Sequence, residues 1–467
     1  MVRPNPMVVA QGSAGGQRLG FVLRSPTPAL DRPRSHMFDE TGPAIKTLPG
    51  FLLGRRPDGS LFQGVAAKNY RRASHALGTR AAMIEREDIV QVLEGYESSN
   101  IRIATIGSHS ALDVCDGAIE EGFQTLVFCE KGREAPYARY FRSVRDKDGH
   151  VVRGAVDDAI VLGKFEEVVS PKFQEHLRSV SGLFIPNRSF TSYVDLDAIE
   201  EDFRIPIFGS RNLLRTEERE FEKSYYWILE KAKLPTPEKF EQPRDIDGLA
   251  IVKLPHKVKK LERGFFTAAS YQEFREKSQS LLKQGVISEK DLKNARIERY
   301  IIGPIFNFDF FYSPIEDSAE KLELLGIDWR FETSLDGHVR LPAEQQRTLN
   351  EVQRIPEYVV VGHNSATLRE SSLNDVFAIA ERYVKATQQH FPPGIIGPFT
   401  LQTAVDKDLQ FWVYDVSPRI GGGTNVHMSL GHPYGNSLWR RPMSTGRRIA
   451  MEIRHGIDTA RLGELVT

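Results

Sequence analysis

The chain has 467 residues, a formal net charge of zero and two cysteines. This length is enough for two or three domains with substantial cores. The sequence contains no apolar run long enough to cross a bilayer and opens with no secretory signal. Cys115 and Cys129 lie in apolar surroundings without metal-ligand spacing. We therefore expect a cytoplasmic protein with reduced core cysteines and no membrane partner.

The charge is unevenly distributed along the chain. Residues 1–82 carry twelve Lys or Arg against four acidic residues, a net charge of +8, so the remainder carries −8. An acidic body argues against a broad nucleic-acid surface. Residues 1–82 are rich in Gly, Pro, Ser and Arg and lack periodicity, which predicts a disordered basic extension. A nucleic-acid or targeting arm is the weaker alternative, and Met83, which opens a helical pattern, is a candidate true start.

From residue 101 the pattern alternates between strands and helices. The first strand, Ile101–Ile106, is followed by a helix over Ala111–Glu121. Further strands are predicted at Gln124–Cys129, Leu183–Pro186 and Ile205–Gly209. Alternation of this kind predicts a parallel sheet with binding sites at the carboxyl ends of its strands.

A proline pair marks the first domain boundary. The charged, glycine-bearing stretch Arg142–Gly154 is predicted to be a surface excursion, and Arg215–Lys233 a long helix. Leu234-Pro235-Thr236-Pro237 ends that helix. We therefore divide the chain after the basic extension into an α/β domain over 83–234 and a second domain over 235–467.

The second domain combines helices with strands whose alternation suits an antiparallel sheet. The predicted strands are Ala250–Pro255, Ile297–Ile302, Phe306–Tyr312, Leu322–Phe331 and Val359–Val361. The predicted helices are Tyr271–Gln284, Glu289–Asn294, Ser372–His390 and Thr445–His455.

A hairpin is predicted near the end of this domain. Gly397–Val405 and Leu409–Arg419 are rich in β-branched and aromatic residues, and Asp406-Lys407-Asp408 between them is turn-like. Gln402 and Asp415 stand at similar distances from the turn, and cross-strand neighbours lie about 5 Å apart. One hard cation can then take an oxygen from each side chain. The alternative is an ordinary buried hairpin.

Two glycine-bearing loops are candidate anion sites. Arg419 and the run Gly421-Gly422-Gly423-Thr424-Asn425 follow the hairpin, and such a run offers backbone donors to a phosphate. Gly107-Ser108-His109-Ser110 joins a strand to a helix, where free N–H groups favour an anion. It is neither a dinucleotide fingerprint nor a Walker loop. A capping loop with an incidental histidine is the alternative.

Three charged residues sit in apolar strands. Lys253 lies among Ile, Val and Leu, and a buried ammonium needs a partner such as a nucleotide phosphate. Snorkelling of its stem to solvent is the alternative. Glu298 and Glu332 are candidate nucleotide contacts, although either glutamate would also suit a solvated strand face.

Several short motifs, read in order, carry a resemblance to a known family. They are Ile103–Ser110, Glu120–Phe123, Lys131–Arg133, Pro206–Gly209, Asp245–Gly248, Phe311–Pro314, Pro393–Phe399 and Gly422–Asn425. From about Met83 to the C-terminus the chain resembles ATP-grasp enzymes. More narrowly, it resembles the archaeal formate-dependent 5-formaminoimidazole-4-carboxamide ribonucleotide synthetases of purine biosynthesis.

The resemblance implies an α/β ATP-grasp fold with an N-terminal Rossmann-like, parallel-sheet domain. It implies a ligase that joins formate to the aminoimidazole-carboxamide ribonucleotide through a formyl phosphate, with ATP and Mg²⁺ or Mn²⁺. Catalysis would consist mostly of positioning and electrostatics. The partners expected are small molecules, without nucleic acid, in a homo-oligomer.

Individual residues match family positions. The resemblance implies substrate binding by His109, Ser189 and His363, ATP binding by Lys253 and Glu332, metal binding by Gln402 and Asp415, and a catalytic role for Lys253. From the residues themselves we add Glu298 as an ATP contact and Arg419 as a second catalytic residue.

Four departures from the family pattern keep two other functions open. Arg188 replaces a glycine, His363 an asparagine and Asp415 a glutamate, and lysines replace the glycine-rich phosphate loop at 256–260. Glycines let the backbone approach phosphate closely, whereas lysines act as point charges. The alternatives are a relative with a different acid or amine substrate and a nucleotide-binding protein without catalysis.

Overall fold

The computed structural model describes residues 53–55, 61–63, 83–255, 264–318, 320–350, 353 and 359–467. Its contacts divide the chain into two units, Met1–Thr79 and Arg80–Thr467. In the first unit, β1 (Leu53–Arg55) pairs antiparallel with β2 (Leu61–Gln63). The other residues of the predicted basic extension, and the lysine-rich loop at 256–260, lie outside the described residues.

The second unit opens with the expected parallel sheet, in the order β7-β4-β3-β8. Its strands are β3 (Arg102–Ile106), β4 (Gln124–Glu130), β7 (Asp158–Leu162) and β8 (Gly182–Phe184). The helices of this part of the chain are α2 (Arg86–Glu94), α3 (Ala111–Glu120), α4 (Pro171–Ser179), α5 (Arg188–Tyr193), α6 (Arg211–Leu214) and α7 (Tyr225–Lys231). The predicted surface excursion forms an exposed pair, β5 (Val144–Arg145) and β6 (Val151–Arg153). Cys115 and Cys129 are buried and unpaired, as expected.

Two elements differ from the prediction. The long helix over Arg215–Lys233 is wrong: a single 3-10 turn over Arg215–Glu217 is followed by turns, and α7 begins at Tyr225. The charged run between them has no apolar stripe to bury, so packing does not support a continuous helix there. The strand expected at Ile205–Gly209 is reduced to isolated bridges at Ile207 and Phe208. Pro206 beside them has no N–H for a ladder.

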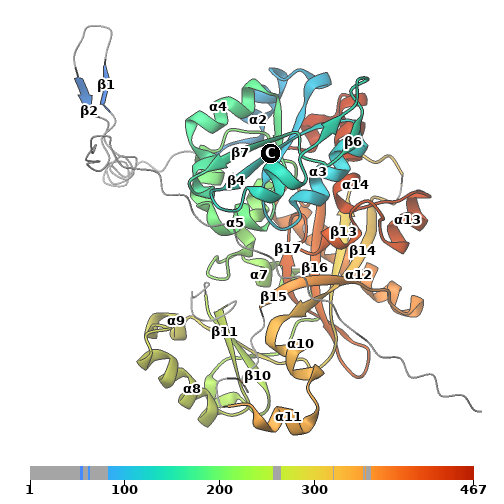
Figure 1. Ribbon diagram of the computed structural model, residues 1–467. Coiled ribbons are helices and arrows are strands. Elements are labelled where there is room, and N and C mark those ends of the chain that lie inside the picture. The colour runs from blue at the N-terminus through green and yellow to red at the C-terminus, as the bar shows by residue number, and fades with distance from the viewer. Residues whose placement is uncertain are drawn as a thin grey trace, which may run out of the picture. The chain divides into compact units, whose positions relative to one another are not determined.

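Two antiparallel sheets follow, in the orders β11-β10-β12-β9 and β15-β14-β13-β16-β17. The strands of the smaller sheet are β9 (Lys239–Phe240), β10 (Ala250–Lys253), β11 (Phe265–Ala268) and β12 (Arg296–Arg299). Those of the larger sheet are β13 (Ile305–Tyr312), β14 (Leu322–Glu332), β15 (Val360–Ser365), β16 (Gly397–Val405) and β17 (Phe411–Ser417). The helices are α8 (Tyr271–Lys283), α9 (Glu289–Lys293), α10 (Thr333–Arg340), α11 (Ala343–Thr348), α12 (Leu373–His390), α13 (Pro433–Trp439) and α14 (Thr445–Asp458). Figure 1 shows α8 and α9 beside β10 and β11.

Around Asn307 and Gln402 the larger sheet has one apolar and one polar face, because successive side chains of a strand point to opposite sides. Phe308, Phe310 and Leu401 point into a core that they share with α7 and α12. Asn307 and Gln402, which are register partners on β13 and β16, point the other way. Both are buried even though they are polar, so this face is built to hold polar groups.

The last helix returns to the first sheet. Figure 1 shows α14, in red, beside α3. The two helices approach so closely that a Cβ on Gly117 would lie 2.1 Å from the backbone nitrogen of Arg447, and one on Gly446 would lie 1.9 Å from the Asp113 carbonyl. The predicted domains over 83–234 and 235–467 are therefore in direct contact through these helices. In the described part of the chain no helix is long and apolar enough to span a bilayer.

Candidate active site

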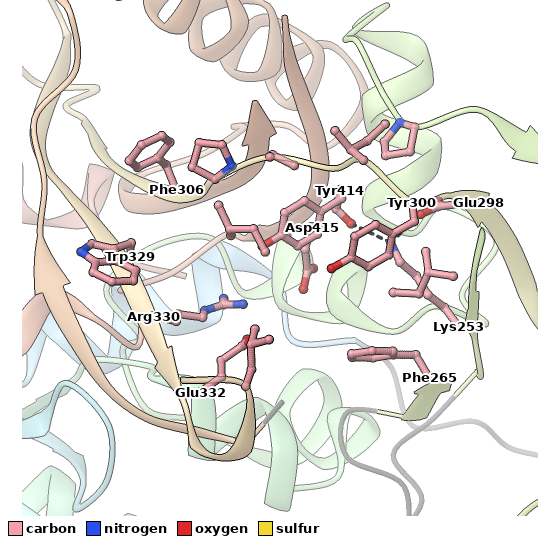
Figure 2. Close-up of a pocket in the computed structure, with 18 of the residues that line it drawn as sticks. Lys253, Phe265, Glu298, Tyr300, Phe306, Trp329, Arg330, Glu332, Tyr414 and Asp415 are labelled. Carbon is pink, nitrogen blue, oxygen red and sulfur yellow. Dashed lines mark hydrogen bonds and ion pairs between the residues drawn. The ribbon is translucent and has the colours of Figure 1, made fainter. Parts of the chain in front are cut away.

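A cavity of about 640 Å³ lies between the two antiparallel sheets. Its volume falls within the range of roughly 300–1,000 Å³ that is usual for small-molecule sites. Aromatic and aliphatic side chains form much of its wall, among them Phe265, Phe306, Trp329 and Leu335. Figure 2 shows Lys253 and Glu298 on one side, Arg330 and Glu332 on the other, and Asp415 between them.

Lys253 is held inside this cavity and does not snorkel. It ends β10 between β11 and β12, and only 5% of its surface is exposed. Its Nζ lies 2.5 Å from Glu298 Oε2 and donates to the hydroxyl of Tyr226 at 3.1 Å and to the carbonyl of Tyr414 at 3.2 Å. Its charge therefore has a protein partner within the site.

Glu298 faces Lys253 from β12, where its register partner is Ile251. Burial by itself would raise the pKa of Glu298, but the charges of Lys253 and Arg296 outweigh burial and lower it. Arg296 also donates its Nε hydrogen to the other carboxyl oxygen and stacks over the Tyr226 ring at 3.9 Å. A ligand with more negative charge than this buried, ionised carboxylate can replace it as the partner of Lys253.

Glu332 stands at the opposite wall. It ends β14, is 6% exposed and lines the cavity together with residues of α10. Its backbone N–H donates to the carboxylate of Asp336, which fixes the start of α10 over the cavity. The sequence pattern gave no sign of this helix, whose Leu335 and Val339 side chains line the cavity and stay exposed to solvent there.

The expected metal ligands are brought together. Gln402 on β16 and Asp415 on β17 are direct register partners, which confirms the predicted hairpin pairing. Asp415 lines the cavity, while Gln402 is 7% exposed and accepts a hydrogen bond from Arg330 through its Oε1. The described residues contain no cluster of three His, Cys, Asp or Glu side chains suited to a metal. Two protein oxygens together with nucleotide phosphates are the ligand set typical of Mg²⁺, so this pair fits such an ion.

The glycine loop, Gly421–Asn425, lies against a second polar cluster. A Cβ on Gly422 would lie 3.4 Å from His109 Nδ1, and one on Gly423 would lie 2.5 Å from His363 Nδ1. Asn425 donates to the His109 carbonyl at 2.7 Å and so fastens the loop that follows β3. Two of the predicted substrate residues thus flank consecutive glycines.

Ser189, the third predicted substrate residue, is fixed by a neighbour that the sequence analysis missed. Asn187 caps α5 by accepting from the Ser189 N–H at 3.0 Å, and its Nδ2 donates to the carbonyls of Ile106 at 2.7 Å and Ser108 at 3.1 Å. This cap ties α5 to the loop that carries His109. The Ser189 hydroxyl is buried and has no hydrogen-bond partner among the described residues, which suits a bound ligand.

Arg188 and Arg419 share one carboxylate. Glu217 Oε2 lies 2.5 Å from Arg188 Nη1, and Glu217 Oε1 lies 2.9 Å from Arg419 Nε. Burial lowers the pKa of Arg419, which is 4% exposed, while the charge of Glu217 opposes that shift. The arginine that departs from the family pattern therefore has a carboxylate partner within the protein, which it shares with Arg419. Arg419 lies outside the cavity lining.

The predicted residues fall into three groups. Lys253, Glu298, Glu332 and Asp415 line the cavity. His109, His363 and Ser189 belong to the cluster around the glycine loop. Gln402 lies between the cavity and this cluster, since it accepts a hydrogen bond from Arg330, whose register partner is His363.

The sequence analysis gave no role to Asn187, Glu217, Asp309 and Asp328. Asp309 stands in the run Phe308-Asp309-Phe310-Phe311 and carried the same signal as Lys253, a charge in an apolar strand.

Comparisons with known proteins identify the family and the fold of this chain. Residues 103–240 match a family model described as a protein of unknown function (DUF1246), and residues 273–467 match one described as a domain of unknown function (DUF1297). A structure described as an IMP biosynthesis protein PurP from Thermococcus kodakaraensis has a TM-score of 0.57 and 29% identity, and covers 78% of this chain and 100% of its own. This likeness confirms the expected ATP-grasp fold.

Two curated relatives share more of the sequence. The 5-formaminoimidazole-4-carboxamide-1-(beta)-D-ribofuranosyl 5'-monophosphate synthetase of Methanothermobacter thermautotrophicus is 40% identical over 385 residues, which are 82% of this chain and 99% of that protein. The protein of the same name from Methanopyrus kandleri is 40% identical over 386 residues, 82% of this chain and 100% of its own. The chain therefore belongs to the family of 5-formaminoimidazole-4-carboxamide ribofuranosyl monophosphate synthetases.

Proposed function

We propose that this protein is an ATP-dependent ligase that joins formate to the amine of 5-aminoimidazole-4-carboxamide ribonucleotide in purine biosynthesis. The observation that carries the proposal is the continuity of two sites. The cavity lined by Lys253, Glu332 and Asp415 adjoins the cluster of His109 and His363 through Arg330, which lines the cavity and is the register partner of His363. The family to which the chain belongs is named for this product.

ATP would occupy the cavity of about 640 Å³. The apolar wall suits an adenine ring, and Lys253 would exchange Glu298 for a phosphate oxygen. Because Glu298 already lies 2.5 Å from the ammonium group, this exchange needs little movement of the lysine. Glu332 on the opposite wall would accept hydrogen bonds from the nucleoside.

A divalent ion fits beside the phosphates, held by Gln402 and Asp415, which are register partners. When bound, Mg²⁺ or Mn²⁺ supplies positive charge that neutralises the ATP phosphates. Arg330, which donates to Gln402 Oε1, would turn its guanidinium toward a phosphate oxygen.

The proposed reaction has two steps. A formate oxygen attacks the γ-phosphorus, the bond to the bridging oxygen breaks, and ADP leaves with formyl phosphate formed. The amine nitrogen of the ribonucleotide then attacks the formyl carbon, phosphate leaves, and the nitrogen loses one proton. Lys253 would neutralise charge during the phosphoryl transfer. Arg419, which pairs with Glu217 and donates to the Ile420 carbonyl, would fix the residue that precedes the glycine loop.

The deciding experiment is product analysis by mass spectrometry. The purified protein is incubated with Mg²⁺, ATP, formate and the aminoimidazole-carboxamide ribonucleotide, and then with each component omitted in turn. We expect one formylated nucleotide for each ADP, in the complete mixture only. Absence of any nucleotide turnover would contradict the proposal and favour a binding protein.

A second candidate is a ligase of the same fold with another amine or acid. Arg188 and His363, which replace family residues near the substrate cluster, favour it. ADP production that requires a different acid or amine would identify this function. The cytoplasmic location, the homo-oligomeric state and the absence of a nucleic-acid partner stay predictions.

A further inference from the structure

We propose that Arg219 is a catalytic residue of the phosphoryl transfer, and that its guanidinium holds the γ-phosphoryl group of ATP as this group moves to formate. The sequence motifs gave this residue no role. The proposal deepens the proposed function and rests on it, because it concerns the first of the two steps.

Arg219 reaches the nucleotide cavity from the first domain of the chain. It lies in the charged run between the 3-10 turn Arg215–Glu217 and α7, near the end of the predicted domain over 83–234. Among the described residues that line the cavity, Arg219 is the one that comes from this domain, and the others begin at Pro237. The first domain therefore contributes one positive charge to a cavity whose other walls come from the second.

The guanidinium is fixed beside the strand that carries the phosphate lysine. Arg219 Nη1 donates to the carbonyl of Leu254 at 2.9 Å, and Leu254 directly follows Lys253. Burial opposes the charged form of Arg219, but neighbouring groups, among them Asp415, outweigh burial and raise its pKa above the ordinary value. Arg219 is therefore a charged group at the end of the cavity where Lys253 and Asp415 also stand.

The turn that carries Arg219 is anchored on both sides of this residue. Two residues earlier, Glu217 Oε1 lies 2.9 Å from Arg419 Nε. Two residues later, the backbone N–H of Phe221 donates to the Glu218 carbonyl at 3.2 Å. A backbone held in this way presents the guanidinium before ATP binds, which is the preorganisation that electrostatic catalysis requires.

Two neighbours place Arg219 at the γ end of the triphosphate. Asp415, the proposed metal ligand, is close enough to act on its charge. Arg419, which is tied to the same turn through Glu217, donates to the Ile420 carbonyl just before the glycine loop. The turn thus contacts both the nucleotide cavity and the segment that leads to the substrate cluster. The transferred group crosses from ATP to the acid between these two places.

The phosphoryl transfer needs positive charge at this point. A formate oxygen forms a bond to the γ-phosphorus, the bond to the bridging oxygen breaks, and its electrons leave with ADP. The negative charge of the transition state is spread over the three equatorial oxygens of the moving group. A guanidinium donates two parallel hydrogen bonds to such oxygens, whereas an ammonium is a point charge. Arg219 keeps its protons throughout and lowers the barrier by electrostatics.

The assignment is tested by nucleotide binding and by rate, in wild type, Arg219→Gln and Arg219→Lys. Calorimetric titration in the presence of Mg²⁺ gives the Kd of ADP and of the β,γ-imido analogue of ATP, which differ in the γ-phosphoryl group. Steady-state formamide formation gives kcat. Lys223→Gln is the matched control. It removes a positive charge from the same run, but Lys223 is exposed, lies over the ring of Trp227 and is outside the cavity lining.

We expect Arg219→Gln to bind ADP within about threefold of wild type, because ADP lacks the group that Arg219 holds. The imido analogue should bind roughly tenfold more weakly, as expected for one lost charge-assisted hydrogen bond. The kcat should fall by ~10²-fold or more, the usual cost of losing one donor to a developing charge. Arg219→Lys should recover more of the analogue's affinity than of kcat, since it keeps the charge without the planar fork. Lys223→Gln should match wild type in all three measurements.

Three results would overturn the assignment. Equal weakening of ADP and the imido analogue in Arg219→Gln, with a lowered Tm, would show that the side chain only supports the cavity wall. An unchanged kcat in Arg219→Gln would exclude a contact with the moving group. Equal affinity of wild type and Arg219→Gln for the imido analogue would exclude a contact with the γ-phosphoryl group of the bound nucleotide.

The binding comparison needs neither formate nor the ribonucleotide, so failure of the proposed function can be told apart from failure of this assignment. Formamide formation by wild type with no effect of Arg219→Gln would contradict the assignment alone. A wild type that forms no formamide, but whose preference for the imido analogue over ADP disappears in Arg219→Gln, would contradict the proposed function and support the γ-phosphoryl contact.

Discussion

At the scale of single residues, Lys253 shows what a local sequence pattern can predict and what it cannot. A lysine in an apolar strand requires a partner, and the sequence predicted that requirement; the partner in the folded protein is Glu298, 45 residues further along the chain. The same reasoning applied to Asp309 would have found a buried side chain that was missed. Asn187 and Glu217 were harder to find, because the contacts that tie them to the site are long-range: the Asn187 amide reaches the Ile106 carbonyl, 81 residues away, and Glu217 pairs with Arg419, 202 residues away.

We predict that Glu298→Gln destabilises the ligand-free protein. It leaves Lys253, 5% exposed, without its carboxylate, and removing one member of a buried ion pair costs roughly 3–5 kcal/mol. Denaturant unfolding measures the loss, and added Mg²⁺-ATP should restore part of it by giving Lys253 a phosphate. The control is Glu241→Gln, which breaks an exposed pair with Lys239 and should cost less than about 1 kcal/mol. Equal losses in the two variants would refute this account of Lys253.

We predict that Glu217 makes stability depend on pH. Burial raises its pKa, but Arg419 and Arg188 outweigh burial and hold the folded-state pKa below the ordinary value of 4.5. The ionised carboxylate thus stabilises the fold above pH 4.5, and this contribution is lost as the pH falls through the lower folded-state pKa. Unfolding free energies at pH 7 and near pH 3 should show Glu217→Gln less stable than wild type at the first pH and closer to it at the second. A difference that is constant with pH would contradict the prediction.

At the scale of elements, the composition of the strands and of the turn between them predicted the hairpin correctly. The hairpin of β16 and β17, and the pairing of Gln402 with Asp415, follow from its composition and its turn. Charge-rich segments were misleading. The run after Arg215 suits a helix by propensity, yet Glu217 is drawn to Arg419 and the run breaks into turns. Propensity is a weak prior wherever a long-range ion pair competes with it.

The glycine loop gives the sharpest prediction at this scale. Gly423→Ala places a methyl group 2.4 Å from Asp328 Oδ1 and 2.5 Å from His363 Nδ1, so the loop must shift away from both. We expect a raised KM for the ribonucleotide and a loss of stability of ~1–3 kcal/mol, as for other overpacking substitutions. Gly337→Ala in α10 is the control, because a Cβ there meets nothing within 4 Å. It should stabilise the protein by roughly 0.5–1 kcal/mol. Normal substrate binding by Gly423→Ala would show that the loop does not form the nucleotide site.

At the scale of the whole molecule, the order of motifs predicted the family and the fold, since ordered segments carry information that composition does not. The contact between α3 and α14, which brings the end of the chain to the first sheet, was not predictable from the sequence. Gly117 and Gly446 allow α3 and α14 to touch, and they are more than 300 residues apart. Each glycine alone looks like a mild helix weakness. Only the folded chain shows that both are required by the same contact.

The final residues are fastened to the parallel sheet, and we predict that the fold depends on them. Thr467 exchanges two backbone hydrogen bonds with Ile207, at 3.2 and 3.0 Å, and its carbonyl accepts from Arg211 at 2.8 Å. Leu465 and Val466 are fully buried. Removing residues 465–467 exposes apolar surface worth about 1.5–3 kcal/mol for each of these two side chains, and breaks hydrogen bonds of ~1 kcal/mol each.

The truncated protein should therefore unfold at least ~10 °C below wild type, since 1 kcal/mol corresponds to about 2–4 °C in a large domain. Scanning calorimetry measures the shift. Glu464→Gln, which weakens only an exposed pair with Arg461, is the control and should change the midpoint by no more than about 2 °C. A truncated protein that melts with the control would mean that the contacts of Thr467 with Ile207 and Arg211, and the burial of Leu465 and Val466, do not stabilise the fold. A large shift accompanied by loss of formamide synthesis would instead show that the sheet carrying His109 is held in place by the far end of the chain.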